Sequence, residues 1–182
     1  MTLSVVLIVA GVLLFTGYKF ANDTVAAQLS SQKIFFPPAG SEAITSLPKA
    51  DAAVISQYAG EQVVNGAQAE AYASHFIGVH LNEVAGGQTY AEVSGKAIQD
   101  PTNTKLQDQA NVLFKGTALR GMLMNAYAFW KFGQIALWAM WAAFALAAIM
   151  GIFAILGFWH LRKVDDEAEL KEPTLHLHRA TA

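Results

Sequence analysis

The stretch that decides the fold is IALWAMWAAFALAAIMGIFAILGF, residues 135–158, a run of two dozen residues without a charged side chain. A bilayer core about 30 Å thick needs roughly 20 apolar helical residues, so this run is long enough to cross it. Inside lipid every backbone N–H must be bonded within its own segment, which a helix achieves. Trp130 and Trp159 lie near the two ends, where indole rings favour the headgroup boundary. The stretch therefore predicts a C-terminal transmembrane helix over residues 131–161.

A second apolar run, LSVVLIVAGVLLFTGY, covers residues 3–18 and is followed by Lys19. It is either a secretory signal or a retained anchor. A signal peptide would carry a basic segment before the run and a small-residue cleavage site after it. Only the amino terminus precedes this run, and no clear A-x-A sequence follows it. We therefore interpret residues 1–20 as an N-terminal transmembrane anchor.

The composition agrees with a membrane protein. Charged residues make up 14% of the 182 residues, against about a quarter in an ordinary soluble chain. The net charge of −2 and the absence of a Lys/Arg cluster with interleaved aromatic residues argue against nucleic acid as a partner. Because the chain has no cysteine, disulfides, thiolate zinc sites, iron–sulfur ligation and covalent c-type haem are excluded.

Residues 21–130, between the two apolar runs, show no alternating β pattern and are expected to form a small helical domain. The segment FFPPAG should end the helical pattern that leaves the first span, because two consecutive prolines exclude helix. Thr89 and Glu92 have the spacing of a capping box. Residues 41–47 are expected to be a loop. Helices are predicted over residues 49–58, 62–84, 90–99 and 104–127, the last continuing into the second span.

The distribution of basic residues predicts the orientation. Arg162 and Lys163 follow the second span directly, which favours a cytoplasmic C-terminus. With two spans the N-terminus is cytoplasmic as well, and the central domain is extracytoplasmic. Lys19 and Lys131, at the outer ends, oppose this assignment. The sequence thus predicts a multi-pass protein of the plasma (inner) membrane with a polar cytoplasmic tail, residues 162–182, that is mobile or bound to a partner.

The histidines do not form a metal-ligand pattern. His75 and His80 are five residues apart, so they differ by about 140° around a helix and cannot share one ion from one face. His80 and Glu83 reverse the order of the Glu-x-x-His pair in di-iron bundles. His176 and His178 could hold a metal, but a stray pair in a polar tail is the simpler interpretation. We expect no metal, no cofactor and no catalytic residues.

Neither span carries an ionisable residue in its middle, which argues against a transporter or proton pathway. The second span instead carries small residues four apart, Ala143, Ala147 and Gly151, which would let another helix approach closely. Trp138 and Trp141 lie in the same span. We predict that these five residues form an interface with helices of a partner membrane protein.

Two segments carry a family resemblance: AGGQTYAEVS, residues 85–94, and LFKGTALRGMLMNAYAFW, residues 113–130. They resemble a family of small actinobacterial membrane proteins with one span at each end and a helical extracytoplasmic domain. Some members carry the label of a ring-opening dioxygenase, for which this sequence offers no metal ligands. Others resemble accessory subunits of the respiratory supercomplex of cytochrome bcc and cytochrome oxidase. The resemblance covers residues 60–160 and brings no functional residues with it.

The sequence therefore predicts an all-α membrane protein with two transmembrane helices flanking a small helical extracytoplasmic domain. The expected function is that of a non-catalytic accessory subunit of a membrane complex. The resemblance implies that its partners are haem-containing respiratory complexes of the electron transport chain. The alternative is a membrane-anchored protein whose outer domain binds or senses a ligand or lipid.

Overall fold

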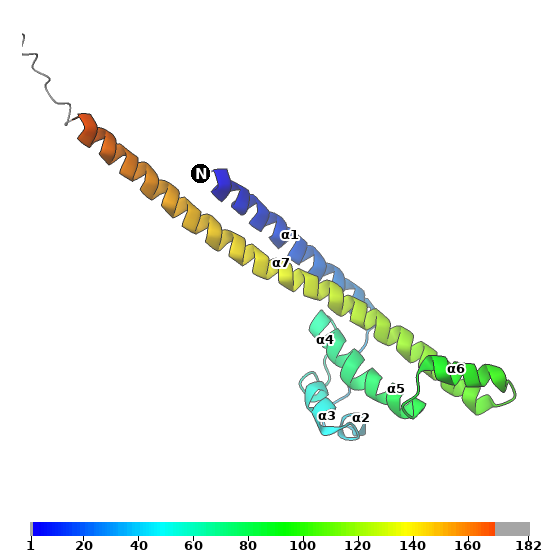
Figure 1. Ribbon diagram of the computed structural model, residues 1–182. Helices are drawn as coiled ribbons and strands as arrows, with labels where there is room; N and C mark the ends of the chain where they lie inside the picture. The colour runs from blue at the N-terminus through cyan, green and yellow to red at the C-terminus, as the bar shows by residue number, and fades with distance from the viewer. Residues whose placement is uncertain (1, 170–182) are drawn as a thin grey trace, which may run out of the picture. The chain divides into compact units, whose positions relative to one another are not determined.

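The structure, a computed structural model, describes residues 2–169, with side chains as far as Lys163 (Figure 1). Over these residues the fold is all-helical, as predicted. An isolated antiparallel bridge between Phe35 and Gln62 is the only β pairing in the described part. In chain order the elements are α1 (Thr2–Gln32), α2 (Glu42–Thr45), α3 (Lys49–Ser56), α4 (Gly66–Ala71), the π-helix η1 (Tyr72–Ile77), α5 (Gly78–Ala85), α6 (Tyr90–Gln99) and α7 (Thr104–Glu169).

Two of these helices, α1 and α7, are long and apolar enough to cross a membrane; their most apolar windows have mean hydropathies of 2.0 and 2.3. The helical pattern was predicted to continue beyond the first apolar run, and this is confirmed, because α1 extends to Gln32. The helix predicted from residue 104 and the second span form one 66-residue helix, α7. Helix α7 also runs past residue 161, where the span was expected to end, because residues 162–169 include neither Gly nor Pro.

The chain divides into two compact units, and α1 and α7 contribute to both. Among the described residues, 2–14 with 138–169 form one, which we call the helix-pair unit, and residues 15–137 form the other, the domain unit. In the helix-pair unit, α1 and α7 lie side by side (Figure 1). Phe144 of α7 covers Gly11 so closely that a Cβ at Gly11 would overlap its ring.

The core of the domain unit joins both long helices to the short ones. Val25 and Leu29 of α1 and Leu123 of α7 are almost fully buried, together with Ile55 and Val63. The ring of Phe36 packs on Tyr58 and Tyr72, with centroids 5.2 Å away in each pair. A second, smaller cluster lies between α6 and the start of α7, and comprises Ala85, Val93, Ala97, Ala110 and Leu113.

Helix α6 begins and ends where the sequence predicted. Thr89 Oγ1 accepts a hydrogen bond from the backbone N–H of Glu92, and the Glu92 carboxylate accepts one from the N–H of Thr89 at 2.7 Å. The bonds that Thr89 donates from its backbone and its side chain hold the pKa of the Glu92 carboxyl below its ordinary value. The predicted capping box is therefore confirmed.

Two local predictions, both in the domain unit, were wrong. The helix expected from residue 62 begins at Gly66, because the Asn65 side chain caps it by accepting from the N–H of Gln68 at 3.0 Å. Val63 instead donates its N–H to the carbonyl of Ile34, at 2.9 Å, beside the bridge. The segment expected to be a loop over residues 41–47 contains the short helix α2, with Ile44 buried in the core.

Candidate functional site

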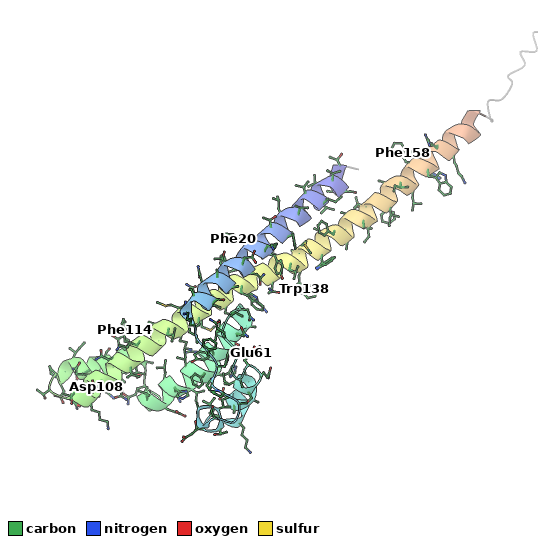
Figure 2. The ribbon with its side chains drawn as sticks, turned by 180° about the vertical axis from the view of Figure 1, so that it is seen from behind. Phe20, Glu61, Asp108, Phe114, Trp138 and Phe158 are labelled. Atoms are coloured by element: carbon green, nitrogen blue, oxygen red, sulfur yellow. The ribbon has the colours of Figure 1, made fainter. Side chains whose placement is uncertain are left out.

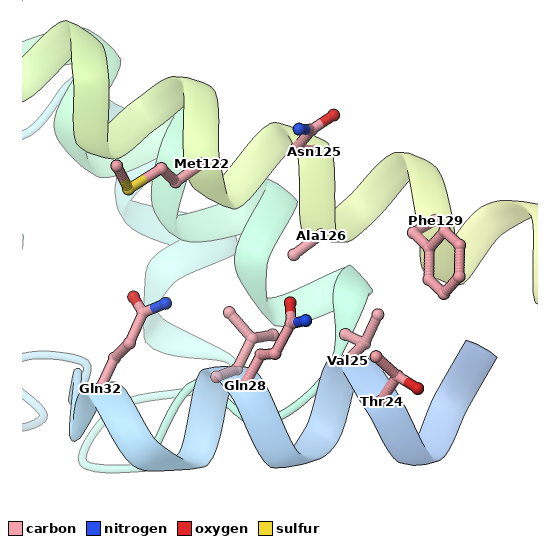
Figure 3. A pocket seen from close by; sticks show the side chains of 9 residues that line it. Thr24, Val25, Gln28, Gln32, Met122, Asn125, Ala126 and Phe129 are labelled. Carbon is pink, nitrogen blue, oxygen red and sulfur yellow. The ribbon is translucent and has the colours of Figure 1, made fainter. Parts of the chain in front are cut away.

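A groove of about 430 Å³ lies between α1 and α7 within the domain unit (Figure 3). One wall comes from the C-terminal half of α1, and the other from the part of α7 that precedes the apolar run. Nine side chains line it: Thr24, Val25, Gln28, Leu29, Gln32, Met122, Asn125, Ala126 and Phe129. None of the nine is charged, so the groove offers hydrogen bonds and apolar contact only.

The α1 wall is polar. Thr24, Gln28 and Gln32 are four residues apart, so they share one face of the helix. Figure 3 shows Gln28 and Gln32 rising from α1 toward α7. Within the described part of the chain, neither amide side chain is bonded to another residue, and both are exposed. Each amide therefore keeps two N–H donors and a carbonyl acceptor for a ligand.

The α7 wall and the floor are apolar. Met122, Ala126 and Phe129 face α1 (Figure 3), and Val25 and Leu29 close the floor with 1% and 2% of their surface exposed. Asn125, which projects from the outer side of α7 in Figure 3, adds one polar group at the rim. The groove thus has a hydrogen-bonding wall opposite an apolar one.

The edge of the groove nearest the apolar runs is aromatic. Phe129 meets Phe20 edge to face, with ring centroids 6.2 Å apart. Phe20 is 64% exposed and Phe129 43% exposed, so an apolar surface continues from the groove onto the outside of the two helices. The nearest charges on α1, Lys19 and Asp23, neutralise each other in an ion pair at 3.8 Å.

The histidines of the domain unit are held by hydrogen bonds inside it. His75, in the π-helix, donates from Nδ1 to the Asp51 carboxylate at 2.7 Å. His80 donates from Nδ1 to the backbone carbonyl of Phe76 at 2.8 Å. No three metal-ligating side chains come together among the described residues. Burial raises the pKa of Tyr72, whose ring packs between Phe36 and Phe76, so this phenol stays neutral at physiological pH.

The residues predicted to form one interface lie on different faces of α7. Ala143 and Ala147 are buried, with 8% and 5% exposed. Residues 2–14 of α1 are the other described segment of the helix-pair unit, and Phe144, the neighbour of Ala143, packs on Gly11 of that segment. Gly151 is partly exposed, and a Cβ there would meet no atom within 4 Å. Trp138 and Trp141 are 75% and 61% exposed.

The exposed tryptophans belong to a surface that continues along α7. They are three residues apart, so they project on the same side of the helix, and Figure 2 shows Trp138 on the outside of α7. Farther along, Phe158 projects from a part of α7 that α1 does not reach (Figure 2). The exposed large apolar residues of this last part include Ile152, Phe153, Ile155, Leu156, Phe158, Trp159 and Leu161.

The groove was not predicted from the sequence. The polar wall could have been predicted, because Thr24, Gln28 and Gln32 recur every four residues in a segment expected to be helical and therefore share one face. Its apolar wall lies about 100 residues farther along the chain, and no sequence pattern links the two. His176 and His178 lie outside the described residues.

Comparison of the chain with models of known families, with characterised proteins and with solved structures finds no match.

Proposed function

We propose that this chain is a non-catalytic accessory subunit of a membrane protein complex, anchored by α1 and α7. The observation that carries the proposal is the pair of exposed tryptophans, Trp138 and Trp141, on a helix whose small residues Ala143 and Ala147 are already buried inside the chain. Large aromatic side chains contribute most to protein interfaces when a partner covers them. A second helix packed against these indoles would bury them without disturbing the contact between α1 and α7.

The proposed orientation places residues 21–130 outside the cytoplasm and both termini inside it. Arg162 and Lys163 support it, because positive residues beside a span favour the cytoplasmic side. The Lys163 ammonium lies 4.6 Å from the centroid of the Trp159 ring, a cation–π contact. A tryptophan and a lysine paired in this way are typical of an anchor at the membrane boundary.

The proposed partner is a respiratory complex that contains haem. The support is the resemblance of residues 85–94 and 113–130 to accessory subunits of the actinobacterial supercomplex of cytochrome bcc and cytochrome oxidase. In this proposal the chain bridges or stabilises the other subunits and leaves electron transfer to their haems.

Native electrophoresis in a mild detergent tests the proposal. Tagged protein should migrate in a large band that absorbs as b-, c- and a-type haem, and mass spectrometry of that band should identify the partner subunits. A small band without pigment, in more than one mild detergent, would contradict association with a respiratory complex.

The tryptophans allow a sharper form of the same experiment. Replacing Trp138 and Trp141 together by Leu keeps the helix apolar but removes both indoles, so we expect the large band to lose the tagged chain. Trp159→Leu is the control for loss of an exposed indole, since Trp159 is 60% exposed but lies at the other end of the span. Loss of the band in the control alone would place the contact elsewhere.

The groove between α1 and α7 favours a second candidate function, a membrane-anchored binding or sensing protein. Its two unpartnered glutamines and its apolar wall suit a small amphiphilic ligand better than a catalytic reaction. The two functions are compatible, because the groove and the exposed tryptophans are formed by different residues.

A further inference from the structure

We infer that the groove between α1 and α7 binds the uncharged, polyhydroxylated headgroup of a glycolipid. Gln28, Gln32 and Thr24 would bond its hydroxyl groups, and Met122 and Phe129 would contact its apolar face. The inference requires that α1 and α7 cross a membrane. It does not depend on association with a partner complex.

The chemistry of the lining selects an uncharged headgroup. A phosphate has only acceptor oxygens and is bound most strongly by Arg and Lys, but the groove contains neither residue. A sugar hydroxyl both donates and accepts, which matches the free N–H and carbonyl groups of Gln28 and Gln32. The C–H face of a sugar ring suits the apolar wall formed by Met122, Ala126 and Phe129.

The position of the groove suits a headgroup attached to a lipid. On α1 it begins at Thr24, six residues after the apolar run ends at Tyr18; on α7 it ends at Phe129, six residues before the run begins at Ile135. The polar layer outside the hydrocarbon core is about 5–7 Å thick. Six helical residues rise about 9 Å, so the groove begins a few ångströms outside that layer, within reach of a sugar headgroup that extends from it. Acyl chains would then follow the exposed rings of Phe20 and Phe129 toward the core.

The length of the groove suits a short sugar chain. Thr24 and Gln32 are eight residues apart, which is about 12 Å along α1. Within this length the groove, with a volume of about 430 Å³, has room for one or two sugar rings.

Nanodiscs containing the full-length chain test the inference. The discs are made of phosphatidylcholine with either diglucosyl diacylglycerol or phosphatidylglycerol, and native mass spectrometry counts the lipids that remain on the released protein. We expect the glucolipid to be retained several-fold more than the anionic lipid. Addition of free maltose distinguishes a lipid headgroup from a soluble sugar as the natural ligand. Maltose should not displace the glucolipid if the acyl chains contribute to binding.

Two variants connect retention to the groove. Gln28→Leu removes an exposed amide without changing the core, and should reduce glucolipid retention about fivefold, as expected for one lost uncharged hydrogen bond. Ala126→Phe fills the groove and should abolish retention. Gln57→Leu and Ala128→Phe are the matched controls, because both residues are exposed outside the groove and should retain the lipid as the unchanged chain does.

Equal retention of the two lipids, preference for phosphatidylglycerol, or unchanged retention in Gln28→Leu would overturn the inference. Binding of maltose alone with the same affinity as the glucolipid would assign the groove to a soluble sugar instead. Because these discs contain no partner complex, failure of the accessory-subunit proposal would leave every one of these outcomes unaffected.

Discussion

Gly66 and Trp130 show how one residue without a side chain positions a large one in the domain unit. Gly66 is buried at the start of α4, and the Trp130 side chain of α7 lies where a Cβ of residue 66 would be. A glycine has no side chain, so another residue can come close to its backbone. Gly66 therefore lets α4 lie against the indole of Trp130. In the same way, the Leu81 side chain of α5 fills the space at the Cβ position of Gly116 in α7.

We expect Gly66→Ala to destabilise the domain unit by about 1–3 kcal/mol, because its methyl group would overlap the rigid start of the Trp130 side chain. The thermal midpoint of helix loss, measured by circular dichroism in detergent, should fall. Gly95→Ala is the control: Gly95 lies within α6 with no atom near its Cβ position, so the same substitution should stabilise by roughly 0.5–1 kcal/mol. An unchanged midpoint for Gly66→Ala would mean that α4 and α7 separate easily.

Local features of this kind differ in how well the sequence predicts them. The capping box of α6 was predictable because Thr89 and Glu92 are three residues apart and need no third partner. The role of Gly66 was not, since its partner is 64 residues away along the chain. The helix start at Gly66 was missed for a related reason: Val63 bonds Ile34, a contact between distant segments.

At the level of the elements, α1 and α7 meet at regularly spaced positions within each of the two units. On α1 the least exposed residues recur every three or four positions, from Ser4 through Gly11 and Tyr18 to Val25. This spacing is that of the inner face of a left-handed helix pair. On α7, Met140, Ala143 and Ala147 continue the same pattern. The sequence revealed the small-residue face of α7, but periodicity cannot say which helix covers it.

A pair of cysteines tests this packing inside the domain unit. A Cβ built on Gly133 of α7 lies 2.9 Å from the Cβ of Ala21 on α1. A disulfide needs about 3.5–4.5 Å between these atoms, which a small shift supplies. We expect Ala21→Cys with Gly133→Cys to form a crosslink under mild oxidation. After cleavage at a protease site inserted in the exposed loop at Gly40, the two fragments should stay joined on a non-reducing gel.

The control pair is Ala27→Cys with Ala128→Cys, two exposed positions outside the contact. Because the natural chain has no cysteine, no other disulfide can form. Fragments that separate in the first pair, or remain joined in the second, would show that α1 and α7 do not pack as described.

For the molecule as a whole, the helix class and the two long apolar helices were predictable from the sequence, because both depend on composition and on patterns within one segment. The groove was not predictable, because its walls come from distant segments: Gln28 and Gln32 on α1, and Met122 and Phe129 on α7. The predicted continuation of the helix over residues 104–127 into the second span is confirmed, and both Gly116, which sits under Leu81, and Gly121 lie within this unbroken helix.

The proposed orientation has the largest consequence at this scale, since it decides which side of the membrane the groove faces. Ala53→Cys, exposed on α3, should react with a membrane-impermeant maleimide in intact cells, and Ala168→Cys, beyond the second span, only after permeabilisation. Arg162 and Lys163 favour this result, while Lys19 and Lys131 oppose it. The reverse labelling would invert the topology and place the groove at the cytoplasmic leaflet. Labelling of both cysteines in intact cells would mean that only one of the two helices crosses the membrane.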